Sequence, residues 1–102
     1  MQLQAPYVVA TTTDDRIARL RQTLDDLARM RQDVEILLGN TAIIDQAERA
    51  AKEAARLYTD AHAAAMLGDH RDATRRLEQA ALAQQTVVGC LAWLAEEGGY
   101  DG

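Results

Sequence analysis

One stretch of the chain, residues 58–73, holds the side chains most able to do chemistry: His62, His70, Asp60, Asp69 and Asp72. Two side chains on one helix can hold a metal together only when three or four residues separate them, because only then do they share a face. Neither histidine has a carboxylate, a cysteine or the other histidine at that spacing. The spacing therefore argues against a metal or acid–base site, and we predict no metal and no cofactor.

Two of the aspartates in this stretch have a structural interpretation. Gly68 can end one helix in the left-handed conformation, and Asp69 then stands at the N-cap of the next helix. Asp72 lies three residues further on, close to the positive end of that helix's dipole. This arrangement is typical of a capped turn between two helices.

Nucleophilic catalysis has equally little support from the sequence. Cys90 is the single cysteine and lies in the apolar run VVGCLAW, where burial would leave its thiol protonated and inert. The chain has no G-x-S-x-G turn and no phosphate-binding loop. We therefore expect a protein that is not an enzyme.

The elements that position these residues are expected to be helices. The chain has 102 residues, the size of one domain, and 48% of them are apolar. Alanine dominates this apolar set and phenylalanine is absent. Small side chains let helix backbones approach one another closely, so the composition predicts helices packed on helices.

Apolar residues recur at helical spacing in three segments, which we expect to be helices over about 13–38, 42–67 and 70–96. Glycines at 39 and 68 separate them. The middle segment is apolar around about half of its circumference, so it should lie between the other two. Short turns make neighbouring helices antiparallel, which predicts an all-α, up-down-up three-helix bundle over residues 12–97.

Two polar residues interrupt the apolar faces of this bundle. Arg31 interrupts the seam of the first helix, and Gln84 interrupts that of the third. Asn40 or Thr41 is expected to cap the second helix.

The two ends of the chain are expected to lie outside the bundle. Residues 98–102 should form a flexible C-terminal tail, and residues 1–11 an extended N-terminal arm. The arm carries proline followed by strand-favouring residues: Pro6, Tyr7, Val8 and Val9. It is either a loose terminus or a segment that packs on its own bundle or on another subunit.

Residues 68–83, GDHRDATRRLEQAALA, resemble the second half of a tetratricopeptide repeat, with matching small and apolar positions at Gly68, Ala73, Leu77 and Ala80 or Ala81. His70 stands where that family usually has an aromatic residue, and no second copy of the pattern is present. The same pattern also resembles microtubule-interacting-and-transport domains. Both resemblances imply binding of a peptide or protein rather than catalysis.

Charge and hydropathy exclude other classes of partner. The formal net charge of −5 argues against direct binding to nucleic acid, which requires a basic surface. The longest apolar run has nine residues, far fewer than the roughly 20 that a membrane-spanning helix needs. The N-terminal residues do not have the pattern of a secretory signal. We therefore expect a cytoplasmic protein that binds neither nucleic acid nor membrane.

The third helix carries a second apolar track opposite its core face, at Leu82, Thr86, Gly89 and Trp93. Glycine is unfavourable in a helix interior but permits close approach of a neighbour, and tryptophan is a frequent interface anchor. Trp93 could instead cover part of its own bundle.

We favour a partner interface made by this track together with Pro6–Val9 of the arm. The sequence thus predicts a helical protein–protein interaction module that self-associates as a homo-oligomer or assembly component. The alternative is a small acidic inhibitor or adaptor that binds a basic, nucleic-acid-handling protein.

Overall fold

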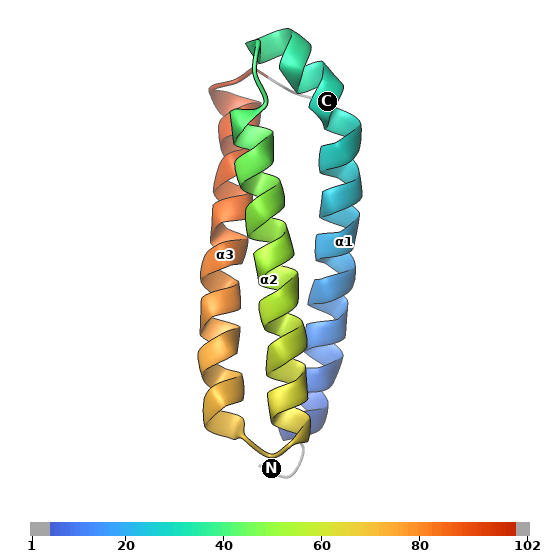
Figure 1. Cartoon of the computed structure of the whole chain (residues 1–102), viewed down its shortest axis with the longest axis vertical. Helices are drawn as coiled ribbons and strands as arrows, with labels where there is room; N and C mark the ends of the chain where they lie inside the picture. Colours follow the sequence, from blue (N-terminus) through green and yellow to red (C-terminus); the bar gives the residue numbers. More distant parts are fainter. Residues whose placement is uncertain (1–4, 100–102) are drawn as a thin grey trace.

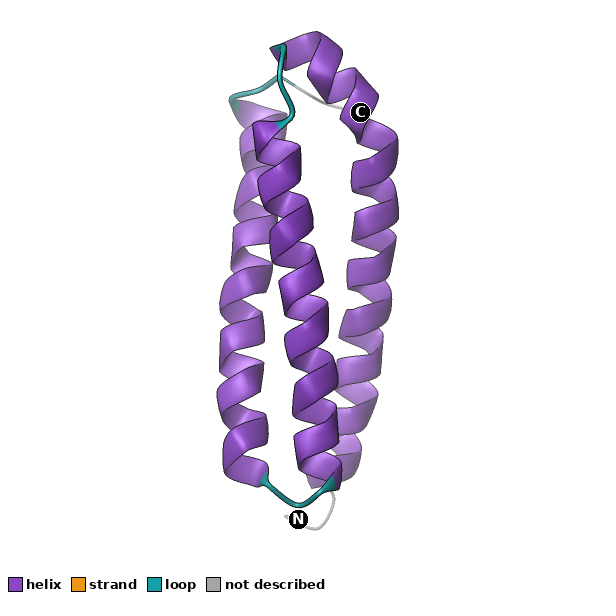
Figure 2. Ribbon diagram, in the orientation of Figure 1, coloured by secondary structure: helices purple, strands orange, loops and turns teal. Residues whose placement is uncertain are grey.

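The computed structural model describes the backbone of residues 5–99 and the side chains of residues 13–99. Three helices follow one another as antiparallel neighbours: α1 (Ala5–Leu38), α2 (Ala42–Met66) and α3 (His70–Glu96). Figures 1 and 2 show them side by side in a rod that measures 51 × 18 × 18 Å. The predicted all-α, up-down-up three-helix bundle is confirmed.

The start of α1 differs from the sequence prediction. The extended arm was expected to continue to residue 11, but the backbone is helical from Ala5 onward. Pro6 is compatible with this start because the N–H groups of a first helical turn have no partner within the helix, so proline removes nothing there. Residues 1–4, and the side chains of Pro6, Tyr7, Val8 and Val9, lie outside the described part. The same holds for residues 100–102 of the expected tail.

The two turns follow the predicted glycine chemistry. Gly39 and Gly68 have φ values of +77° and +85°, which residues with a Cβ rarely adopt. After the second glycine, the carboxylate of Asp69 accepts a hydrogen bond of 3.1 Å from the backbone N–H of Asp72. The predicted N-cap of α3 is therefore confirmed.

Both residues that were predicted as possible caps of α2, Asn40 and Thr41, form hydrogen bonds at its start. Thr41 occupies the N-cap position, but its side chain does not bond to the helix backbone. Asn40 supplies that bond instead, because its side-chain oxygen accepts from the backbone N–H of Ala42 at 3.0 Å. The hydroxyl of Thr41 donates to the Asp45 carboxylate at 3.3 Å.

The middle helix, α2, packs against both of the other helices. α2 packs most extensively against α3 and next against α1, while the backbones of α1 and α3 stay farther apart. Four alanines of α2 are completely buried: Ala47, Ala51, Ala54 and Ala61. Their small side chains bring α2 close to its neighbours. Side chains of α1 and α3 still meet in the core, where Leu20 clusters with Val87 and Leu27 clusters with Leu94.

Arg31, the polar interruption of the α1 seam, faces α2. Its guanidinium donates to the carboxylate of Asp45 at 2.8 Å and also to that of Glu48. Both acids lie in the first turns of α2. A cation at a seam position is thus accommodated because two carboxylates of the adjacent helix receive it.

Candidate functional site

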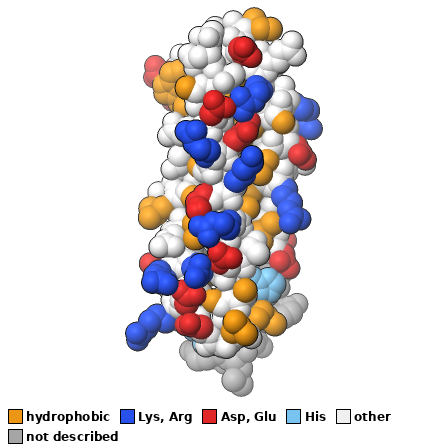
Figure 3. All heavy atoms as spheres, in the orientation of Figure 1, with side chains coloured by type: hydrophobic (Ala, Val, Ile, Leu, Met, Phe, Trp, Pro, Cys, Tyr) orange, Lys and Arg blue, Asp and Glu red, His pale blue; other side chains and the backbone are white. Residues whose placement is uncertain are grey.

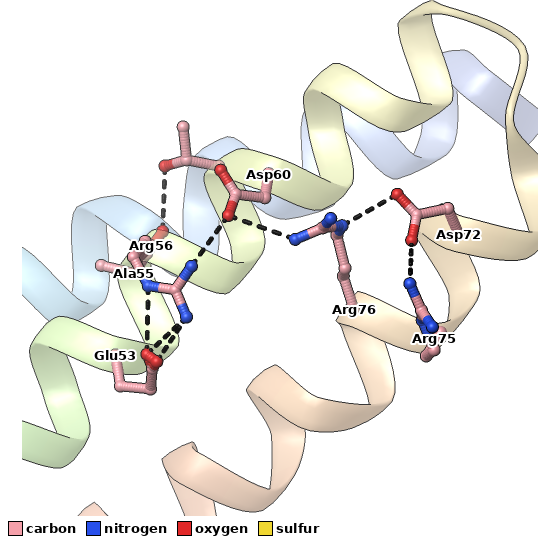
Figure 4. A network of polar contacts seen from close by, with 8 residues as sticks. Glu53, Ala55, Arg56, Asp60, Asp72, Arg75 and Arg76 are labelled. Atoms are coloured by element: carbon pink, nitrogen blue, oxygen red, sulfur yellow. Dashed lines mark hydrogen bonds and ion pairs between the residues drawn. The ribbon is translucent and has the colours of Figure 1, made fainter.

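Two of the three aspartates of residues 58–73, Asp60 and Asp72, take part in an ion-pair network between α2 and α3 (Figure 4). Arg76 of α3 connects the two helices, because it lies 3.3 Å from the carboxylate of Asp60 on α2 and 2.9 Å from that of Asp72. Arg56 approaches the same Asp60 carboxylate at 3.1 Å, and Arg75 approaches Asp72 at 2.7 Å. These carboxylates are engaged by arginines, so their arrangement serves to align the helices.

The two histidines occupy different environments. His62 lies on α2 with its Nδ1 atom 3.7 Å from a carboxylate oxygen of Asp14 on α1, and His70 is exposed at the start of α3. Among residues 13–99, no three histidine, cysteine or acidic side chains come close enough to hold a metal ion. Residues 58–73 therefore form a turn between two helices that is flanked by ion pairs.

Arginine partners lower the pKa of carboxyl groups in these contacts. Hydrogen bonds from Arg31 lower the pKa of Asp45, and hydrogen bonds from Arg76 and Arg75 lower the pKa of Asp72. A carboxyl group with a lower pKa in the folded chain than in the unfolded chain stabilises the fold in its ionised form. This contribution is complete above the unfolded pKa of about 3.9 and is lost as the pH falls through the folded value.

We therefore expect the melting temperature to fall as the pH is lowered from about 5 to below about 3.9. Asp45→Asn should be less stable than the wild type at neutral pH and should lose less stability on acidification. Circular dichroism melts over this pH range measure both quantities. Asp33→Asn is the matched control on α1, since Asp33 is exposed and no ion pair within residues 13–99 involves it. Parallel pH profiles for wild type and Asp45→Asn would contradict the assignment.

Cys90 is buried in the core, with 4% of its surface exposed. Burial raises the pKa of its thiol, so the reactive thiolate is disfavoured. The residue packs with Leu27 and Leu94 as a small apolar side chain. This burial agrees with the prediction from the apolar run VVGCLAW that the thiol is protonated and inert.

The four predicted interface residues of α3 all lie on its exposed side. Leu82 and Trp93 are 65% and 44% exposed, and Thr86 and Gly89 between them are exposed as well. Apart from the adjoining residues and the backbone of its own helix, no atom of the described residues lies within 4 Å of the position that a Cβ on Gly89 would take. These residues form one surface, which we call the α3 outer track. The four arm residues predicted with it cannot be placed on this surface, because their side chains lie outside the described part.

At its Trp93 end, the α3 outer track borders a hollow that could not be predicted from the sequence. Trp93 lines this space of about 330 Å³ together with residues of the α1–α2 junction: Leu38, Asn40, Ala42, Ile43 and Gln46. In Figure 1 the last turns of α1 lean over the same end of the bundle. Trp93 thus both borders its own bundle and presents a large exposed face. Helical periodicity could place Trp93 on the outer side of α3, but it could not show which residues of another helix lie beside it.

The indole of Trp93 is also held from the C-terminal side. A Cβ on Gly98 would lie 3.1 Å from the Cζ3 atom of Trp93, so the chain passes directly against the ring after α3 ends. Glycine at position 98 permits this contact. The exposed tryptophan ring is therefore in close contact with the chain that follows α3.

Known protein families, curated proteins and solved structures give no match to this chain. The resemblances to tetratricopeptide repeats and to microtubule-interacting-and-transport domains therefore find no support in a family match. Within residues 5–99, none of the helices combines the length and the apolar character needed to cross a membrane.

Proposed function

We propose that this protein is a non-enzymatic helical interaction module that associates with a second copy of itself through the α3 outer track. The observation that carries the proposal is the exposure of Leu82 and Trp93 on one side of α3 with open space above Gly89. Large apolar side chains beside a glycine are suited to the close approach of another helix. The hollow beside Trp93 supplies an additional recess for a partner side chain.

The spacing within the α3 outer track supports a two-fold partner. The pair Leu82 and Trp93 and the pair Thr86 and Gly89 are both centred on the same point, between residues 87 and 88. In an antiparallel pair of α3 helices, Leu82 of one copy would face Trp93 of the other, and Thr86 would face Gly89. The small residues then lie nearest the symmetry axis, where the two helix backbones are closest.

Light scattering over a range of protein concentrations tests this proposal. Trp93→Asp should raise the dimer dissociation constant by at least about thirtyfold, the factor that corresponds to the 2 kcal/mol of an interface hot spot. Val88→Asp is the matched control, because Val88 is also exposed on α3, at 62%, but lies outside the α3 outer track. A wild-type protein that stays monomeric at high concentration, or equal effects of the two substitutions, would refute the dimer.

The alternative of an acidic inhibitor has weaker support. Figure 3 shows acidic and basic side chains interspersed over the visible face, without a concentrated acidic region. Several of the acids pair with arginines, which reduces the negative field available to a basic partner: Asp26, Asp45, Glu48, Glu53, Asp60 and Asp72. Binding to a basic protein that weakens steeply with salt would favour this alternative over self-association.

A cytoplasmic location belongs to the same proposal. Its support is the lone buried Cys90, which has no second cysteine in the chain with which to form a disulfide.

A further inference from the structure

A second candidate site is a short groove between α1 and α3, on a different side of α3 from the outer track. A hollow of about 400 Å³ opens there, with Tyr58 of α2 at its base. Its other lining residues come from α1 and α3: Arg16, Arg19, Ala81, Gln84, Gln85 and Val88. A volume of this size lies within the usual range for small-molecule sites.

Tyr58 holds the polar side chains of this groove in position. The tyrosine is 1% exposed, and its hydroxyl donates a hydrogen bond of 2.6 Å to the side-chain oxygen of Gln84. The same hydroxyl accepts from the guanidinium of Arg16 at 3.4 Å, and the Cζ atom of Arg16 lies 5.4 Å from the centre of the tyrosine ring. One buried side chain of α2 therefore fixes a cation on α1 and an amide on α3.

The groove has an excess of hydrogen-bond donors. Arg16 directs one of its five N–H groups to Tyr58, and the side-chain oxygen of Gln84 is already used as an acceptor, which leaves its amide N–H groups free to donate. Within residues 13–99, no carboxylate lies within 4 Å of Arg16 or Arg19. Five other arginines do have carboxylate partners: Arg29, Arg31, Arg56, Arg75 and Arg76. Arg21, Arg49 and Arg71 lack such a partner among the described side chains as well, but only Arg16 and Arg19 line the hollow.

We propose that this groove binds a carboxylate or phosphate group carried by a small organic ligand. The anionic group accepts hydrogen bonds from Arg16, Arg19 and the amide of Gln84, because guanidinium groups recognise both kinds of oxyanion. The apolar part of the ligand lies against Ala81 and Val88 at the α3 edge of the groove. This site is separate from self-association, since neither Leu82 nor Trp93 lines it.

Titrations followed by NMR test this proposal with three probes of similar size: hexanoate, hexyl phosphate and the uncharged hexanol. Both anions should produce saturable shifts in the side-chain N–H signals of Arg16, Arg19 and Gln84, and the anion that binds more tightly identifies the preferred group. Hexanol should produce no saturable shift in these signals. Failure of both anions to saturate the signals, or equally tight binding of hexanol, would overturn the proposal.

A matched pair of substitutions separates the local site from the charge of the whole protein. Gln84→Glu keeps an acceptor for the Tyr58 hydroxyl but places a carboxylate among the arginines, and it should weaken anion binding by about tenfold or more. Gln79→Glu adds the same charge at an exposed position of α3 outside the groove and should have little effect. Equal weakening by both would show that only overall charge matters, which contradicts a built site.

Arg16→Gln provides an independent check if the glutamate variant folds poorly. It removes the cation and should also weaken binding by about tenfold. Arg29→Gln is its control, because Arg29 lies on the same helix but is exposed and paired with Asp26. Binding by Arg16→Gln that matches the wild type would rule out the site. Because Trp93→Asp lies outside the groove, it should leave anion binding unchanged even if it abolishes the dimer.

Discussion

Leu27→Ala is expected to lower the free energy of unfolding by about 2–5 kcal/mol. Leu27 is completely buried and belongs to a core cluster with Val34, Ile44 and Leu94, which contains side chains from all three helices. Truncation removes buried apolar surface and leaves a cavity that surrounding helices can close only in part. Each kcal/mol lost should lower the melting temperature of a chain of this size by about 4–8 °C.

Urea unfolding followed by circular dichroism measures the effect of this substitution. Ile36→Ala on the same helix is the control, because Ile36 is 76% exposed and its truncation opens no cavity. We expect Ile36→Ala to change the stability by no more than about 0.5 kcal/mol. Similar losses for the two variants would mean that the buried seam of α1 has been assigned to the wrong face.

Ala54→Leu tests the opposite change, in which a larger side chain is inserted into the close-packed core. Ala54 is completely buried on α2 and belongs to the cluster that contains Leu20, Ala80 and Val87. A larger side chain at this point has no space and must separate α2 from its neighbours. Insertion into a close-packed core costs about 1–3 kcal/mol, although the substitution adds apolar surface.

The measurement is again urea unfolding, with Ala63→Leu as the matched control. Ala63 lies near the end of the same helix with its side chain exposed, so leucine fits there without displacing a neighbour. Ala54→Leu is expected to be destabilised and Ala63→Leu close to neutral. A stabilised Ala54→Leu variant would indicate unfilled space beside α2, contrary to the complete burial of Ala54.

Much of this fold follows from the spacing of apolar residues and from turn chemistry. The two apolar stripes of α2 predicted its place between the other helices, because a helix that is apolar over half its circumference needs neighbours on two sides. Gly39 and Gly68 marked the turns, since positive φ values favour glycine. Asp69 marked the start of α3, because aspartate accepts hydrogen bonds from the first free N–H groups of a helix.

The start of α1 could not be predicted in the same way. Pro6 and the three residues after it have strand and turn preferences, yet the chain is helical there from Ala5 onward. Local preference is a weak guide at a helix start, where proline is compatible with the helix and tertiary context decides how far the helix extends.

The candidate sites, too, could be predicted from the sequence only in part. Helical periodicity placed Leu82, Thr86, Gly89 and Trp93 on the outer side of α3, because it depends only on the residues of that helix. It could not show that Ile43 lies beside Trp93, or that Tyr58 donates to Gln84. Such pairings depend on the register between helices, which residue spacing within a single helix does not determine. Gln84 gave the one usable signal, since a polar residue on an apolar face needs a partner.

The position of α2 between α1 and α3 also has a consequence for the folding kinetics. The most extensive packing joins α2 to α3, which are consecutive in sequence and connected by a short turn. Contacts between near neighbours in sequence close short loops at low entropic cost, and proteins rich in such contacts fold quickly. We expect the α2–α3 hairpin to form the folding nucleus, onto which α1 docks later. The speed of folding would then depend on the buried alanines that α2 presents to α3.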